Sequence, residues 1–517
     1  MDDKSHAHPL RARTNGGFCC IRKSISIPYL VAFGGKWAVR SVMRVLYVAS
    51  EAVPFAKTGG LADVVGALPK FIRQLGHEAV VLIPKYRGVQ SRKTLLPSLT
   101  IPLGNSLRFC AIHEAEPVDD VRFFLVDSPD FYDREELYRH AGKDYPDNAE
   151  RFALLSLAAL EFAKRAPLPP QVIHCNDWQT ALVPLYLKTL YRNDPFFEKT
   201  KTLLTIHNLA YQGVFPRGTM LRLGLPVDLY NSEQLEFYGS INLLKAGIVF
   251  ADKLSTVSEK YSQEIRTVEF GCGLEGVLNK RAADLTGILN GVDYAEWSPE
   301  QDPWLVSNYS AEDLRGKQQC KIDLLNQFGI QDSQDRPLIG IISRMADQKG
   351  FDLLHAVAGT MVQEGFSMVV LGTGEERYTR FFLSLQEQYP AYVGTKISYD
   401  EWLAHKIEGG ADLFLMPSRF EPCGLNQIYS LRYGTVPVVR ATGGLDDTIQ
   451  DYTQSPNGTG FKFDRYSPEE LLATARRALE VYRTPARWKE LVKNGMKRDF
   501  SWHRSAQRYA KLYESLA

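Results

Sequence analysis

Short apolar runs of strand length alternate with longer segments of helical composition over most of this 517-residue chain. The first strand is predicted over residues 45–49, a helix over 61–75 and a second strand over 78–84. Strands that alternate with helices pair in parallel and are covered by the helices that connect them. The pattern therefore predicts an α/β fold built on a parallel sheet. The later elements are strands over 121–126, 172–175 and 203–207 and a helix over 149–166.

The alternation stops once and then starts again. A turn-rich stretch over residues 287–293 interrupts it, and the next strand is predicted over 338–343, with further strand ends near 369–374 and 436–439. A chain of this length can form two hydrophobic cores. We predict a first domain over residues 43–290 and a second over 291–497.

Residues 1–42 differ from the rest of the chain. They are rich in Arg and Lys, and their apolar patch over 27–33 is short and interrupted by Pro28. A secretory signal would need a longer apolar core and a cleavage site of small residues. We predict a disordered extension over 1–42 and take Met43 as a candidate functional start; whether residues 1–42 are translated is not decided by the sequence.

Composition narrows the class of protein. The net charge is +1, so the chain lacks the strongly basic field typical of nucleic-acid binding, and no run of about 18 apolar residues predicts a membrane span. The seven Cys are scattered without zinc-ligand spacing, which favours reduced thiols in a cytoplasmic protein. We expect a cytoplasmic protein with no nucleic-acid or membrane partner.

One stretch combines features of an anion site and a hydroxyl site. An apolar run over 411–417 predicts a buried strand, and Glu421 and Pro422, followed by Gly424 and Leu425, predict a loop that turns into a helix. The backbone N–H groups at such a helix start can hold a phosphate, and a carboxylate can accept hydrogen bonds from hydroxyls. The pattern suits a sugar phosphate, although an ordinary strand-to-helix turn with a surface Glu also fits it.

Two further loops carry cations after predicted strands. Arg344 and Lys349 follow the strand over 338–343, and two converging cations suit a diphosphate. Lys57 precedes Gly59 and Gly60, which allow a ligand to approach the backbone closely, although the spacing is not that of a Walker loop. Solvated surface cations are the alternative at both places.

Four motifs in order carry a resemblance to a known family. They are KTGGLADV (57–64), TIHNLAYQG (205–213), SRMADQKG (343–350) and SRFEPCGLNQ (418–427). They resemble the motifs of bacterial glycogen synthases and plant starch synthases, retaining glucosyltransferases that use ADP-glucose. The resemblance spans Met43 to the C-terminus. It implies the GT-B fold, in which two Rossmann-like domains face each other across a cleft, the first catalytic and acceptor-binding and the second binding the nucleotide sugar. It also implies that a helix within 498–517 crosses back to the first domain.

The resemblance also implies roles for single residues. Arg344 and Lys349 would hold the donor phosphates, His207 would lie against the donor glucose, and Asp177 would lie on the acceptor side. Asn176 stands where the family more often has His, which weakens any role for that position. The implied catalytic residues are Lys57, His207, Arg344, Lys349 and Glu421. The implied donor-binding residues are Gly59, Gly60, Asp63, Asn290, Tyr399, Cys423, Gly424 and Leu425.

By this resemblance we predict transfer of glucose from ADP-glucose to the non-reducing end of an α-1,4-glucan, as in glycogen biosynthesis, with retention of configuration. The chain contains no Asp-x-Asp triplet, and we expect neither a metal nor a cofactor. Whether Glu421 is a covalent nucleophile or an anchor for hydroxyls stays open, and we favour the anchor.

Two alternatives to this activity also stay open. The chain could be another GT-B transferase that uses UDP-glucose or a different acceptor, because phosphate-binding motifs are shared more widely than the pocket for the base. It could also be a catalytically silent glucan-binding protein. Oligomeric state, processivity, primer preference and regulation do not follow from the sequence.

Overall fold

The computed structural model describes residues 30–33, 36–39, 42–331 and 335–516. The chain divides into two units, residues 1–42 and 43–517. In the first unit, β1 (Leu30–Phe33) pairs with β2 (Lys36–Val39) in antiparallel fashion. Our prediction of a disordered extension over 1–42 did not anticipate this hairpin. The remainder of that expectation lies outside the described residues.

The second unit contains a nine-stranded sheet in the order β16-β15-β11-β10-β3-β4-β7-β6-β5. β3 is almost fully buried at the centre of this sheet and pairs in parallel with β4 and β10. The strands are β3 (Arg44–Val48), β4 (Glu78–Pro84), β5 (Lys93–Leu103), β6 (Ser106–Glu114), β7 (Arg122–Asp127), β10 (Val172–Asn176), β11 (Lys201–Ile206), β15 (Lys253–Thr256) and β16 (Leu285–Gly287).

The first sheet is not wholly parallel, and our prediction is wrong at one edge. β6 runs antiparallel to both β5 and β7. Only Gly104 and Asn105 separate β5 from β6, and Gly104 has a positive φ of 59°. Strands joined by a two-residue turn must pair antiparallel, and Gly adopts positive φ without strain.

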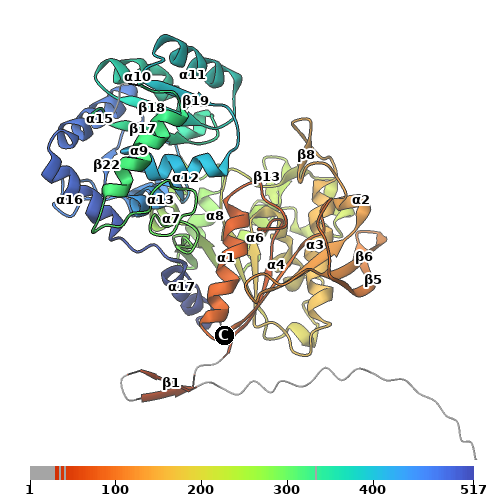
Figure 1. Cartoon of the computed structure of the whole chain (residues 1–517). Coiled ribbons are helices and arrows are strands. Elements are labelled where there is room, and N and C mark those ends of the chain that lie inside the picture. Colours follow the sequence, from red (N-terminus) through yellow and green to blue (C-terminus); the bar gives the residue numbers. More distant parts are fainter. Residues whose placement is uncertain (1–29, 34–35, 40–41, 332–334, 517) are drawn as a thin grey trace, which may run out of the picture. The chain divides into compact units, whose positions relative to one another are not determined.

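Helices cover the first sheet, and one of them comes from the end of the chain. α17 (Trp502–Glu514) packs beside α1 (Gly60–Gln74), as Figure 1 shows. The hydroxyl of Tyr513 lies 2.8 Å from that of Tyr47 on β3 and 2.8 Å from Nδ1 of His174 on β10. The predicted return of the C-terminal helix to the first domain is confirmed. The remaining helices here are α2 (Pro129–Tyr132), α3 (Asn148–Ala163), α4 (Leu182–Lys188), α5 (Thr219–Arg222), α6 (Leu243–Phe250), α7 (Glu259–Glu264) and α8 (Glu275–Lys280).

A second sheet of six parallel strands has the order β19-β18-β17-β20-β21-β22. Its strands are β17 (Leu338–Ile342), β18 (Ser367–Leu371), β19 (Val393–Lys396), β20 (Leu413–Met416), β21 (Val436–Arg440) and β22 (Phe461–Phe463). Its helices are α9 (Arg315–Gln327), α10 (Phe351–Gln363), α11 (Glu376–Gln388), α12 (Glu401–Gly410), α13 (Asn426–Tyr433), α14 (Gly443–Thr448), α15 (Pro468–Tyr482) and α16 (Pro485–Met496). Both faces of each of these two sheets are covered by buried apolar clusters, as expected for two Rossmann-like domains.

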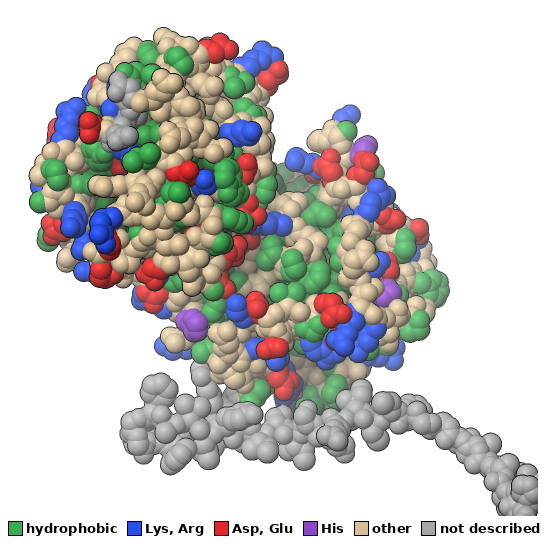
Figure 2. Space-filling view, in the orientation of Figure 1, with side chains coloured by type: hydrophobic (Ala, Val, Ile, Leu, Met, Phe, Trp, Pro, Cys, Tyr) green, Lys and Arg blue, Asp and Glu red, His purple; other side chains and the backbone are tan. Residues whose placement is uncertain are grey.

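Two further features concern the distribution of surface charge and the apolar character of the helices. Figure 2 shows acidic and basic side chains interspersed over the visible face of the described residues. None of the helices in the described part of the chain combines the length and the apolar character that a membrane span requires.

Candidate active site

Glu421 lies in the loop between β20 and α13, and its side chain is buried. Its Oε2 accepts hydrogen bonds from Lys349 Nζ at 2.6 Å and from Ser418 Oγ at 3.2 Å. Lys349 comes from the loop after β17, which is the parallel neighbour of β20. Because the carboxyl ends of neighbouring parallel strands meet at one edge, two residues predicted from separate motifs lie together.

The loop after β17 is held close to the Glu421 loop by a glycine. Lys349 ends the short 3-10 helix η4 (Asp347–Lys349), and Gly350 follows with φ 77°. A Cβ on Gly350 would lie 2.1 Å from the carbonyl oxygen of Pro417, so no side chain fits there. Arg344 lies on the same loop, is exposed, and donates from Nη2 to Oε1 of Gln348 at 3.0 Å.

The loop after β21 supports Glu421 from its other side, and the sequence analysis missed it. The amide of Gly444 donates to the carbonyl oxygen of Glu421 at 3.1 Å. A Cβ on Gly443, whose φ is 46°, would lie 2.0 Å from that same oxygen. The sequence does contain a signal for this turn, because two adjacent glycines, Gly443 and Gly444, follow the strand predicted near 436–439.

Four of the residues predicted to bind the donor are Asn290, Cys423, Gly424 and Leu425. Cys423 is buried, and burial raises the pKa of its thiol to about 12, so the thiol stays protonated at neutral pH. Gly424 adopts a φ of 70°, and Leu425 precedes the first residue of α13. Asn290 is buried, and no partner for its Oδ1 is found among the described residues.

His207 follows β11 and is 8% exposed. Its backbone amide donates to Oδ1 of Asp177 at 2.7 Å, and its Nε2 lies 2.9 Å from Oδ1 of Asn176. The side-chain Nδ2 of Asn176 donates to the backbone carbonyl of Val48 at 3.1 Å, so the side-chain oxygen faces His207. The imidazole of His207 therefore carries its proton on Nε2. Burial lowers the pKa of His207 to about 3, which keeps the ring neutral. The structure thus gives Asn176 a contact that the sequence analysis had discounted.

Asp177 is buried in a strained conformation, with a positive φ of 55°. Burial raises the pKa of its carboxyl to about 7, although the backbone amides of His207 and Asn208 oppose this shift. Because the side chain of Asp177 accepts a hydrogen bond from the backbone amide of His207, it holds the His207 loop in place. A contact of Asp177 with the acceptor stays a prediction.

Lys57, Gly59 and Gly60 lie at the start of α1, where Lys57 Nζ is 2.7 Å from Oδ1 of Asp63. Burial lowers the pKa of the Lys57 ammonium, but Asp63, Tyr399 and Glu401 together outweigh this effect, so the pKa is raised. The last two residues belong to the second domain, and Tyr399 is 81% exposed. Groups predicted to bind the donor therefore face each other from both domains.

The buried Glu51 supports the loop that carries Lys57, and the sequence analysis did not identify it. Its Oε1 accepts from the hydroxyl of Thr58 at 2.7 Å, and its carboxylate also accepts from the Tyr138 hydroxyl and the Thr58 amide. A buried carboxylate that accepts several hydrogen bonds fixes its neighbours firmly. Sequence spacing gave no signal for these contacts because Tyr138 lies 87 positions from Glu51.

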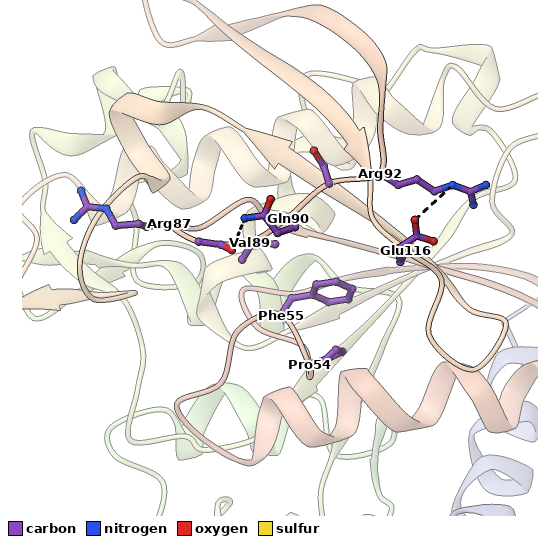
Figure 3. A pocket seen from close by; sticks show the side chains of 9 residues that line it. Pro54, Phe55, Arg87, Val89, Gln90, Arg92 and Glu116 are labelled. Atoms are coloured by element: carbon purple, nitrogen blue, oxygen red, sulfur yellow. Dashed lines mark hydrogen bonds and ion pairs between the residues drawn. The ribbon is translucent and has the colours of Figure 1, made fainter.

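Two cavities lie outside the predicted residues. One of about 330 Å³ is lined from both domains, by Ala210 and Phe270 of the first and Phe420 and Arg440 of the second, among others. Another, of about 510 Å³, belongs to the first domain and includes Phe55 and the Arg92–Glu116 pair, as Figure 3 shows. Neither cavity is lined by any of the predicted site residues. No cluster of three or more His, Cys, Asp or Glu suited to a metal ion occurs among the residues that the structure describes.

Family models match both domains. Residues 44–280 match the starch synthase catalytic domain, and residues 325–495 match glycosyl transferases group 1. The glycogen synthase of Koribacter versatilis is 50% identical over 91% of this chain and 98% of its own length. The glycogen synthase of Geobacillus stearothermophilus is 43% identical over 92% of this chain and 98% of its own.

Solved structures show the same fold. The catalytic domain of starch synthase IV from Arabidopsis thaliana, bound to ADP and acarbose, matches with a TM-score of 0.85 and 33% identity over 92% of this chain and 99% of that one. Sucrose-phosphate synthase from Thermosynechococcus elongatus matches with a TM-score of 0.58 and 17% identity over the same shares, which shows the fold alone. The predicted GT-B fold and the predicted family are confirmed. The chain belongs to the glycogen synthase family of glycosyltransferases.

Proposed function

We propose that this chain transfers glucose from ADP-glucose to the non-reducing 4-hydroxyl of an α-1,4-glucan, with retention at the anomeric carbon. The observation that carries the proposal is the contact of Lys349 with Glu421, which puts a cation suited to phosphate beside a carboxylate suited to sugar hydroxyls. Relatives with glycogen synthase names and an ADP-bound starch synthase structure support it.

Arg344 and Lys349 stabilise the leaving diphosphate in this proposal. The bond between the anomeric carbon and the phosphate oxygen breaks, and negative charge grows on that oxygen. Two cations on one loop lower the energy of this charge most when it is fully developed, so they act mainly on the transition state. With the charge met by these side chains, the proposed reaction needs neither a metal nor a cofactor.

Glu421 binds sugar hydroxyls rather than attacking the anomeric carbon. Its Oε2 is held by Lys349 and Ser418, while Oε1 has no hydrogen-bond partner among the described residues and can accept from a hydroxyl. An ion-paired carboxylate is a weaker nucleophile because the cation withdraws its electron density. The acceptor hydroxyl then attacks the face of the sugar from which the diphosphate departs, and its proton passes to the departing phosphate oxygen.

His207 supports the developing positive charge of the glucosyl group. Glucosyl transfer passes through an oxocarbenium-like transition state. A protonated imidazole would repel that charge, whereas burial keeps the His207 ring neutral. Asp177 and Asn176 fix the position of the ring and backbone.

Product analysis tests the proposed linkage and stereochemistry. We expect the wild-type protein, given ADP-glucose and maltopentaose, to form maltohexaose whose new anomeric proton shows an α-1,4 linkage by ¹H NMR. A β linkage would contradict retention. Transfer to another hydroxyl, or transfer only from UDP-glucose, would favour the other GT-B activity.

A further inference from the structure

The short helix α7 (Glu259–Glu264) contacts both loops that carry the proposed catalytic groups. On one side, the hydroxyl of Tyr261 accepts a hydrogen bond from the amide of Leu209 at 3.0 Å, two residues beyond His207. On the other side, the Glu264 carboxylate accepts from the amide of Gly443 at 3.0 and 3.1 Å. Tyr261 and Glu264 are both buried.

The contact of Glu264 leads directly to the Glu421 loop. The hydroxyl of Thr442 also donates to the Glu264 carboxylate, at 3.1 and 3.3 Å. The next amides along the chain are those of Gly443, bound to Glu264, and Gly444, bound to the carbonyl of Glu421. Since a Cβ on Gly443 would strike that same carbonyl, this turn has little room to move relative to Glu421.

Helices α7 and α14 each provide a carboxylate that accepts a hydrogen bond from the N-terminal end of the other helix. Oδ2 of Asp447 on α14 accepts from the amide of Lys260 in the first turn of α7, at 2.9 Å. Lys260 Nζ also pairs with Asp446 at 3.3 Å. A carboxylate at a helix N-terminus is favoured by the unpaired amides and by the helix dipole. Bonds in both directions fix the position of α7 against α14 more firmly than one bond would.

Burial of the Glu264 carboxylate removes water from a charged group, which costs free energy. Burial raises its pKa, and the Gly443 amide and Thr442 hydroxyl partly offset this effect. More distant charges on Lys260 and Arg440 also lower this pKa, but no Lys or Arg among the described residues lies within 4 Å of the carboxylate, so the neutral donors are its hydrogen-bonding partners. A buried carboxylate of this kind defines a geometry, because it loses its hydrogen bonds as soon as the donors move.

We propose that Glu264 and Tyr261 are positioning residues, and that α7 sets the position of Glu421 relative to His207. This inference rests on the proposed function, because it assumes that the two loops act on one sugar. Glu264 touches no reacting atom in this scheme. It acts through Gly443 and Gly444, and its loss lets the two loops drift apart while the phosphate-binding loop of the second domain stays intact.

The test compares Glu264→Ala, Glu264→Gln and Tyr261→Phe with the control Glu259→Ala. Glu259 lies on the same helix, but its exposed carboxylate pairs with Arg508 at 2.7 Å, and exposed pairs contribute little. The measurements are kcat and KM for ADP-glucose with glycogen, and the Kd for ADP by calorimetry.

We expect Glu264→Ala to lower kcat by about 10-fold or more and to leave the Kd for ADP within about 2-fold of wild type. Glu264→Gln should recover part of the rate, because its amide oxygen can still accept from Gly443. Tyr261→Phe should lower kcat in the same way, and Glu259→Ala should match wild type.

Unchanged kcat in both Glu264→Ala and Tyr261→Phe would overturn the inference. So would a parallel loss of kcat, ADP affinity and thermal stability in each variant, since that pattern marks a merely structural role. Failure of the proposed function is distinguishable, because the wild type itself would then not use ADP-glucose. The same variants would then be compared with whichever sugar nucleotide the wild type does use.

Discussion

Lys349 Nζ lies 2.6 Å from Glu421 Oε2, although the two residues are 72 positions apart in the chain. The parallel pairing of β17 and β20 brings their loops to one edge of the second sheet. A cation suited to phosphate and a carboxylate suited to hydroxyls thus share one place. The proposed reaction needs both at the bond that breaks.

We expect Lys349→Ala and Arg344→Ala each to lower kcat by about 100-fold or more, with smaller changes in KM. The reason is that each charge matters most as the leaving diphosphate develops. Steady-state kinetics with ADP-glucose and glycogen measure this effect. Lys489→Ala, which removes an exposed cation on α16, is the control and should keep wild-type turnover. Near-normal turnover in either site variant would contradict the assignment.

Glu421→Gln separates an anchor from a nucleophile. An anchor should lose roughly 1.5 to 3 kcal/mol, the range for a hydrogen bond to a charged group. This corresponds to a residual kcat on the order of 1% to 10% of wild type. A nucleophile replaced by an amide should fall by several more orders of magnitude.

Mass spectrometry of the wild-type protein quenched during turnover gives a second measure of the same question. The anchor role predicts no glucosyl adduct on Glu421. An adduct there, or a folded Glu421→Gln variant that binds ADP without detectable turnover, would rule the anchor role out.

Burial of His207 should make the protein sensitive to acid. Its pKa is about 3 in the folded protein against 6.5 in the unfolded chain, so below pH 6.5 only the unfolded state gains the proton. The contribution of the neutral His207 to the free energy of unfolding is therefore fully present above pH 6.5 and is lost as pH falls toward 3. At pH 5.0 this loss amounts to ~2 kcal/mol for His207.

His207→Gln should reduce that acid sensitivity, because Gln can donate to Asn176 without titrating. The measurement is the difference in urea unfolding between pH 7.5 and pH 5.0 for the wild type and the variant. His174, whose pKa burial also lowers to about 3, remains in both proteins. An equal pH dependence in both would contradict a neutral His207.

Removal of residues 2–42 should leave stability and activity unchanged. The chain divides after residue 42, and β3 begins at Arg44. We expect a protein that begins at Met43 to keep its melting temperature and its specific activity with ADP-glucose. A large loss of either would show that the extension supports the catalytic unit.

Much of the fold could be predicted because strand and helix periodicity is local. The strand predicted over 78–84 coincides with β4, and the motif residues lie on the loops expected for them. The antiparallel edge was missed because β5 and β6 were not recognised as strands and their turn, Gly104–Asn105, was overlooked. Pairing direction then follows from turn length, which a search for alternating strands and helices ignores.

The supporting contacts could not be predicted in the same way. Asn176 and Glu51 act through partners that are 31 and 87 positions away, His207 and Tyr138. Glu264 meets Gly443 at a distance of 179 positions. Motifs identify residues that face a ligand, whereas the residues behind them are defined only by packing.

The incorporation of labelled glucose into glycogen, from ADP-glucose or from UDP-glucose, tests the central claim most directly. The purified wild-type protein should incorporate glucose from ADP-glucose much faster than from UDP-glucose, and Lys349→Ala should lose this incorporation. Faster incorporation from UDP-glucose, or none from either donor by a folded protein that binds glycogen, would contradict the account.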